Sequence, residues 1–328
     1  MKKILQVALT VIVILINGQS TATRFFYELS YKPNKDSAKL EKEMMVLDID
    51  ENKSLYQSYT NIQMDSIASI IIKEASNKGF PDFKRIGNRR TRFTHQIAKS
   101  YPISEVLYKD RISMDYYSYR ENPELVWKIS NEKHKIGAYN AQKAIADFGG
   151  RKWIAWFTTE IPFPDGPYKF YGLPGLIVKV GDEAGNYSWE LKGNRKTDQI
   201  AAASSVEGLM SKTGLFVSKE ITKEKFTEKY EQYKKDPLAG IKQMLGQIPS
   251  DVKLSDESSL SKEMRAAEKQ MKENLAKNNN SIELPDRYKK KKIKTLTHKG
   301  FLLNLWQTEK NEKIFISTHL QLIAFYSM

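Results

Sequence analysis

The sequence of 328 residues contains no cysteine. This absence excludes a disulfide scaffold, a thiolate nucleophile, thiolate-held zinc or iron–sulfur sites, and a lipid attached to an N-terminal cysteine. Histidine is scarce, and none of the four histidines belongs to an HExxH-type ligand pair. We therefore predict no metal site, and we expect that the mature protein is not a lipoprotein. The four histidines are His95, His134, His298 and His319.

The motifs of several enzyme classes are also missing. The chain has no GxSxG nucleophile elbow, no phosphate-binding glycine loop and no dinucleotide fingerprint, so we predict no cofactor. One catalytic alternative stays open, because Glu160 and Asp165 form a conceivable carboxylate pair beside aromatic residues. Such a pair is what a hydrolase of glycan or peptide requires. The sequence as a whole favours a non-enzymatic protein.

Long apolar runs are absent except near the N-terminus. Lys2 and Lys3 precede an apolar run at 4–16, and a small and polar stretch follows at 17–22. The run is shorter than the roughly 20 residues that a membrane-spanning helix needs, and the order of the three regions is that of a secretory signal peptide. We predict a signal peptide over 1–22. The mature protein is then exported, periplasmic or secreted, with no transmembrane span after cleavage.

The formal net charge of +14 is concentrated at the two ends of the chain. Lys2 and Lys3 supply two positive charges and the segment from Arg287 onward supplies a net seven, which leaves +5 for residues 23–286. A nucleic-acid interface needs a basic stripe interleaved with aromatic residues on an ordered face, and we predict no nucleic-acid partner. The basic and then apolar tail at 286–328 is either a solvated extension or a segment that contacts an anionic surface.

Short segments of alternating or mixed apolar character predict strands at 24–31, 41–49, 54–59, 92–98, 105–109, 112–120, 125–130, 151–158, 176–180 and 187–192. A capping box at Thr60 and Gln63 and a stripe that includes Met64 and Ile71 predict a helix near 61–77 that covers the sheet. Three helical stripes follow between about 205 and 280. Together these patterns predict an α+β domain over 23–285, with a curved antiparallel sheet, one covering helix and a C-terminal helical segment.

The segment 136–180 carries the most specific pattern. It contains GAYNAQKA, RKWIAWFT and EIPFPDGPYKF, followed by the hexapeptide Gly172-Leu173-Pro174-Gly175-Leu176-Ile177. This segment resembles the GLPGLI family of small exported proteins of Gram-negative bacteria, whose biochemical activity is uncharacterised. The resemblance covers about 150 residues of the chain and implies export to the cell envelope. It departs from the family pattern at Asn140 and Ala141, where members often carry a cysteine, so a role that depends on a thiol is not implied here.

The hexapeptide is explained first as architecture. Strand alternation places Trp153 and Phe157 on one face and Trp156 on the other, which predicts a central strand with both faces covered. Pro174 and Gly175 fit the two middle positions of a type II turn, in which the glycine supplies a positive φ.

The alternative is a binding surface in which aromatic side chains line an apolar groove. The partner would be a lipid-like ligand or another envelope protein, such as an outer-membrane protein. The predicted lining residues are Trp156, Phe163, Tyr168 and Phe170.

Overall fold

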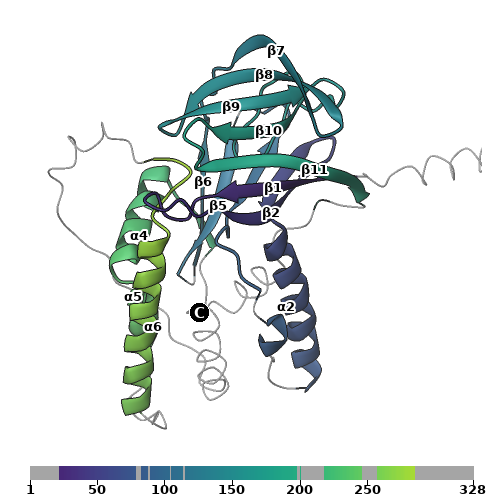
Figure 1. The fold of residues 1–328 in the computed structure, drawn as a ribbon. Helices are drawn as coiled ribbons and strands as arrows, with labels where there is room; N and C mark the ends of the chain where they lie inside the picture. Colours follow the sequence, from purple (N-terminus) through teal and green to yellow (C-terminus); the bar gives the residue numbers. More distant parts are fainter. Residues whose placement is uncertain are drawn as a thin grey trace, which may run out of the picture.

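The computed structural model describes residues 22–78, 83–87, 89–103, 105–113, 115–197, 200, 218–245 and 257–284. These residues build one sheet of twelve strands in the order β12-β6-β5-β4-β3-β2-β1-β11-β10-β9-β8-β7, with helices at its lower side (Figure 1). The predicted signal peptide, apart from Ala22, lies outside the described residues. The predicted tail at 286–328 lies outside them entirely.

Two antiparallel meanders make up the sheet. The first contains β1 (Ala22–Tyr31), β2 (Glu41–Ile49), β3 (Lys53–Ser58), β4 (Gln96–Ser100), β5 (Val106–Ile112) and β6 (Asp115–Glu121). The second contains β7 (Lys128–Ile136), β8 (Tyr139–Phe148), β9 (Arg151–Thr158), β10 (Leu176–Asp182) and β11 (Tyr187–Thr197). Antiparallel pairing of β1 with β11 joins the two meanders into a continuous sheet. The short strand β12 (Ser218–Glu220) adds to β6 in parallel.

The predicted strands correspond to observed strands, with β9 found at its predicted bounds. Two strands are absent from the prediction. Strand β8 has three alanines and no strong alternation of large apolar residues, so its pattern is weak. Strand β12 has three residues, which is too short for periodicity to indicate anything.

The core lies on one face of the curved sheet. Tyr27, Leu29, Trp153 and Trp189 are fully enclosed there, as period-two alternation requires. Large aromatic side chains fill this face in chains of ring contacts, such as the stacked pair Tyr187 and Trp189, whose centroids lie 6.0 Å apart. The interior of the sheet is therefore packed with the protein's own rings.

The expectation that both faces of β9 are covered is wrong. Trp153, Ala155 and Phe157 are buried, but Ile154 and Trp156 on the other face are only half-buried. Strand β9 is third from the β7 edge of the sheet, and no helix lies on its outer face (Figure 1). The outward side chains consequently meet solvent.

The helix predicted near 61–77 is present as α2 (Tyr59–Lys78), but it does not cover the sheet. It projects below β2 and β3 (Figure 1). Its buried residues Ala68 and Ile71 form a separate small cluster with Ile86 of η1 (Phe83–Ile86), apart from the core of the sheet. The apolar stripe of α2 is thus satisfied largely by the segment that follows it in sequence.

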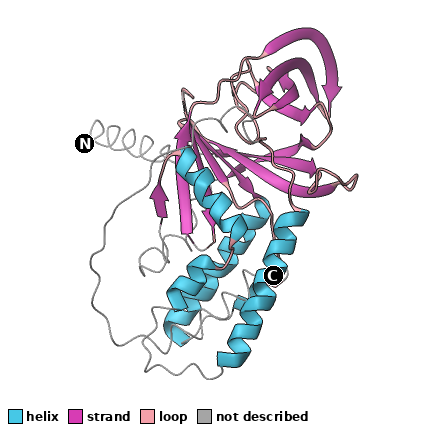
Figure 2. Cartoon of the chain, turned by 90° about the vertical axis from the view of Figure 1, so that its left-hand side faces the viewer, coloured by secondary structure: helices cyan, strands magenta, loops and turns pink. Residues whose placement is uncertain are grey.

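The C-terminal helices are α4 (Lys223–Lys235), α5 (Ala239–Leu245) and α6 (Glu257–Lys277). Figure 2 shows that the helices gather at one side of the strands and do not form a layer over them. Phe226 of α4 contacts the rings of Tyr108 and Tyr119 at centroid distances of 5.6 and 5.2 Å. The chain is mostly β, so the α+β prediction is only loosely supported. No helix among the described residues is long and apolar enough to cross a membrane.

Candidate functional site

The loop between β9 and β10 turns inward and carries charged groups into the core. Asp165 and Lys169 of this loop are fully buried, as are the intervening Tyr168 and the following Phe170. Burying a charge is unfavourable unless the charge is paired and hydrogen-bonded. Each of the two charged residues therefore defines a polar centre whose partners come from distant parts of the chain.

The first centre surrounds Asp165. Its carboxylate pairs with Lys99 of β4, and it accepts hydrogen bonds from Ser54 Oγ and Tyr101 Oη, each at 2.5 Å. Lys99 Nζ also donates to the carbonyl oxygens of Gly166 and Tyr168 at 2.9 and 3.2 Å, which satisfies its three donors. Burial lowers the pKa of Lys99, and the opposing effect of Asp165 does not fully restore it.

The second centre surrounds Lys169. Its ammonium pairs with Glu121 at the end of β6 and with Glu283 beyond α6, and it donates to Tyr119 Oη at 3.2 Å. The rings of Tyr108, Tyr119 and Tyr168 lie 4.8 to 5.4 Å from the same nitrogen. The two ion pairs and the aromatic cage thus enclose the ammonium of Lys169 within the protein.

Glu283 is the shared acceptor of this second centre. Tyr168 Oη donates to it at 2.7 Å, and Lys223 of α4 approaches it at 3.2 Å. Burial would raise the pKa of Glu283, but the charges of Lys169 and Lys223 outweigh burial and hold the pKa at about 2. The carboxylate is therefore ionised throughout the physiological pH range.

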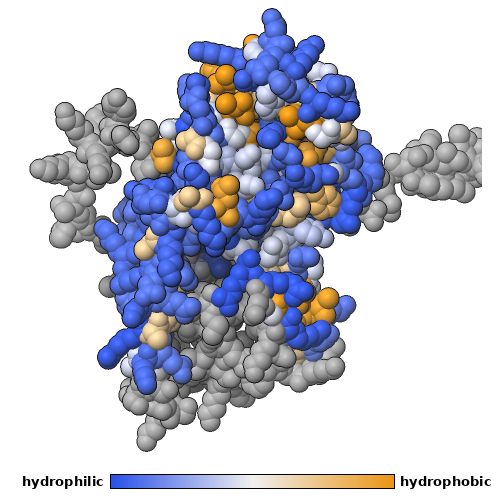
Figure 3. Space-filling model, viewed as in Figure 1, coloured by the Kyte–Doolittle hydropathy of each residue, from blue (hydrophilic) through white to orange (hydrophobic). Residues whose placement is uncertain are grey.

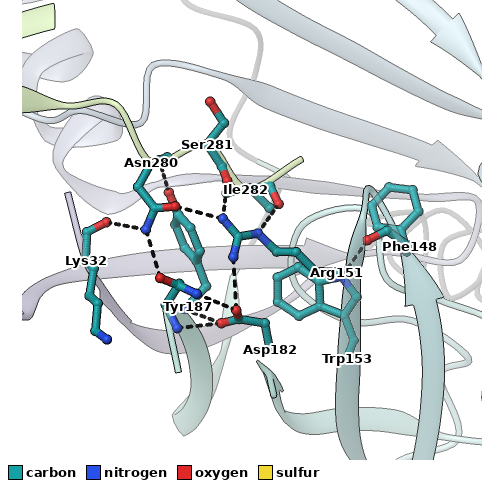
Figure 4. Close-up of polar contacts among 10 residues, drawn as sticks. Lys32, Phe148, Arg151, Trp153, Asp182, Tyr187, Asn280, Ser281 and Ile282 are labelled. Atoms are coloured by element: carbon teal, nitrogen blue, oxygen red, sulfur yellow. Dashed lines mark hydrogen bonds and ion pairs between the residues drawn. The ribbon is translucent and has the colours of Figure 1, made fainter. Parts of the chain in front are cut away.

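The segment Asn280–Leu284, which we call the strap, brings Glu283 to the sheet. Figure 4 shows Arg151 at the centre of its contacts: the guanidinium donates to Asn280 Oδ1, Ser281 O and Ile282 O at 2.7 to 2.9 Å and pairs with Asp182 at 3.0 Å. The backbone N–H of Leu284 donates to Gly149 O at 2.8 Å. These side-chain and backbone hydrogen bonds hold the strap against the β8–β9 hairpin.

His95 lies beside the second polar centre, surrounded by aromatic rings. Its ring stacks on Tyr108 at 5.5 Å and on Tyr56 at 6.1 Å, and its edge meets Tyr168 at 5.7 Å. Its Nε2 atom is buried without a hydrogen-bond partner. Burial lowers the pKa of His95 to about 4, so the ring is neutral at pH 7.

The structure does not bring the four predicted binding residues onto one surface. Tyr168 and Phe170 contact each other inside the core at a centroid distance of 6.1 Å. Phe163 is half-buried against Phe25 at 6.2 Å, and Trp156 lies on the opposite face of β9 from the core. Trp156 and Phe163 are the two members of the set that remain partly exposed.

Glu160 and Asp165 have different surroundings. Glu160 is exposed and accepts hydrogen bonds from the backbone and side chain of Asn140 at 3.0 Å. Asp165 is enclosed and neutralised by Lys99. Among the described residues, no group of three or more histidine or acidic side chains is arranged to hold a metal ion.

The hexapeptide Gly172 to Ile177 closes the loop before β10. Gly175 has a positive φ of +148°, and a Cβ atom there would lie 2.0 Å from the carbonyl oxygen of Thr158. The hydrogen bonding differs from the expected type II turn, since Gly175 N donates to Leu173 O while Leu176 N donates to Ile161 O. Close backbone approach therefore adds a second requirement for glycine at this position.

Trp156 belongs to a small cluster on the outer face. His134 of β7 meets its ring edge at 4.9 Å, and Lys143 Nζ lies 5.8 Å from its centroid. Glu132 pairs with Lys143 at 2.7 Å and with His134 at 3.2 Å. Figure 3 shows apolar side chains among charged ones over the part of the molecule formed by β7 to β10.

Sequence patterns did not predict the partners of the two buried lysines. Lys99, Glu121 and Glu283 lie in unremarkable strand or loop contexts, and their proximity to the β9–β10 loop arises from strand order. Lys169 lies within the segment that carries the family resemblance, and a lone lysine between Tyr168 and Phe170 is the one local signal of a buried cation.

Comparison with known proteins gives a match to one family model, described as "Protein of unknown function (Porph_ging)", over residues 150–179. These residues include β9, the inward loop and the hexapeptide. No curated protein matches the sequence. Two solved structures of PNGF-II, in space groups C2 and P21, are similar with a TM-score of 0.44 each and identities of 15% and 14%. Each similarity covers 66% of this chain and 34% of the PNGF-II chain, so this chain spans about a third of the length of those proteins.

Proposed function

We propose that the protein acts outside the cytoplasm as a non-enzymatic binding protein whose partner is another protein of the cell envelope. The observation that supports this proposal most directly is the position of Trp156. It is half-buried on the outer face of β9, between a cationic side chain and a histidine ring. Tryptophan is one of the residue types that most often dominate protein–protein affinity.

The interior supports a partner that binds from outside. Lys99 has its three donors engaged by the protein itself, the ammonium of Lys169 pairs with two carboxylates, and Tyr168 and Phe170 pack within the core. A lipid-like ligand would need to displace these contacts. The separate surroundings of Glu160 and Asp165 likewise give no reason to favour a hydrolase.

The test is native mass spectrometry of the protein purified from the envelope of its own host, together with lipid extraction. We expect the native protein to retain a protein partner. The Trp156→Ala variant should lose this partner while it remains folded. The matched control is Tyr230→Ala, which removes another aromatic side chain, 39% exposed, from α4. A partner retained equally by Trp156→Ala, or a stoichiometric lipid with no protein, would contradict the proposal.

A further inference from the structure

Among the strands that the structure describes, β7 leaves one edge unpaired next to the Trp156 cluster. It forms one end of the sheet and pairs with β8, with a register shift between Ile129 and Lys133. Seven of its nine residues are exposed. The outward N–H and C=O groups of such an edge form a template onto which another extended chain can add.

The charges of this edge differ from those of the neighbouring outer face. On that face Lys143, Lys179 and Lys192 are each paired with a glutamate at 2.6 to 2.9 Å. Lys128, Lys133 and Lys135 of β7 are exposed, and none has an ion pair with any residue that the structure describes. The edge thus presents three lysine charges without local compensation, which is an arrangement that attracts carboxylates.

The beginning of the edge is apolar. Val126 is 76% exposed and Ile129 is 50% exposed. They are two of the six large hydrophobic side chains that are exposed among the described residues, and they lie within four positions of each other. Lysines alone would be explained as protection against edge-to-edge association, but exposed branched apolar residues have the opposite effect.

We infer that the β7 edge accepts an extended segment of the partner protein by strand addition, with apolar side chains beside Val126 and Ile129 and carboxylates beside Lys133 and Lys135. This inference rests on the proposed binding function and names its surface and ligand chemistry. A second copy of the chain fits less well, because β7 carries three lysines and one glutamate, and self-pairing brings two net positive edges together.

The probe is a fluorescein-labelled peptide Glu-Thr-Glu-Thr-Thr-Thr-Val-Thr-Val. Its antiparallel addition places its glutamates opposite Lys135 and Lys133 and its valines beyond the irregularity of β7, toward Ile129. Binding is followed by fluorescence anisotropy. A second peptide with lysine in place of both glutamates tests the charge requirement. The variant is Lys133→Glu/Lys135→Glu. The control is Lys219→Glu, which makes one such lysine-to-glutamate change at the opposite edge of the sheet, in β12.

We expect the glutamate peptide to bind the native protein and Lys219→Glu equally. The double variant should lose affinity for it by about tenfold or more and gain affinity for the lysine peptide. Hydrogen exchange should show slower exchange of β7 amides when the peptide is bound. Binding unaffected by the double variant, absence of peptide binding, or a dimer that the double variant dissociates would each overturn the inference. If the inference is overturned but the native protein still retains its partner through Trp156, the proposed function stands without strand addition. If the native protein retains no partner in native mass spectrometry, the proposed function itself fails.

Discussion

Lys169 and Glu283, which are 114 positions apart in sequence, form an ion pair inside the protein. Lys169 is fully buried, whereas the side chain of Glu283 is 21% exposed. The pair connects the β9–β10 loop to the strap, and Lys223 extends the connection to α4. The last described residues of the chain are therefore part of the polar core rather than an appendage to the sheet.

Replacing Glu283 by alanine should destabilise the protein by about 2–4 kcal/mol, because it leaves the ammonium of Lys169 short of an acceptor in a buried site. Urea unfolding measures the change. The control is Glu105→Ala, which removes an exposed ion pair with Arg120. Arg120 retains a second ion pair with Glu220, just as Lys169 retains one with Glu121 in the Glu283 variant. We expect little change in the control. Equal effects in the two variants would show that burial does not strengthen the Glu283 contact.

Stability should fall as the pH decreases through the range in which His95 titrates. The folded protein holds the pKa of His95 at about 4, below its usual value of 6.5. The unfolded chain therefore binds a proton first, so the contribution of neutral His95 is complete above pH 6.5 and decreases toward pH 4. The lowering of the His95 pKa on folding corresponds to a loss of about 3 kcal/mol in the free energy of unfolding over this pH range.

The variant His95→Phe, which keeps an aromatic ring among those that surround His95, should weaken this pH dependence. Urea unfolding of both proteins at a series of pH values from 7 to 4 provides the test. Parallel stability curves for the native protein and the variant would contradict the assignment of this pH dependence to His95.

Gly175→Ala should destabilise the protein by at least about 3 kcal/mol, because the new methyl group meets the Thr158 carbonyl and the residue keeps a positive φ. Gly172→Ala separates the two causes. Gly172 has a φ of +90°, but a Cβ atom there would have no neighbour within 4 Å, so its substitution should cost about 1–2 kcal/mol from backbone strain alone. Thermal unfolding measures the stability of both variants. A larger loss of stability for Gly172→Ala than for Gly175→Ala would refute this explanation of the hexapeptide.

Local sequence patterns predicted most strands of the sheet, the helix at α2 and the three C-terminal helices. The positions of the buried side chains of β9 also followed from alternation, since Trp153 and Phe157 share a face in any extended strand. What alternation could not determine is whether the opposite face is covered. That depends on strand order and on where the helices lie, and these leave Trp156 half-exposed.

The sequence by itself determined the absence of thiol chemistry and predicted a positive φ at Gly175, because both follow from the chemical identity of single residues. The close approach of the Thr158 carbonyl to Gly175 is a tertiary contact. Tertiary structure alone decided the partners of Lys99, Lys169 and Arg151. Their acceptors come from strands and loops up to 131 positions away, and nothing in local periodicity specifies which of the chain's many carboxylates and carbonyls will be adjacent. The pairing of β1 with β11 closes the distance between these segments, and the cost of leaving a buried charge unpaired then fixes the contacts.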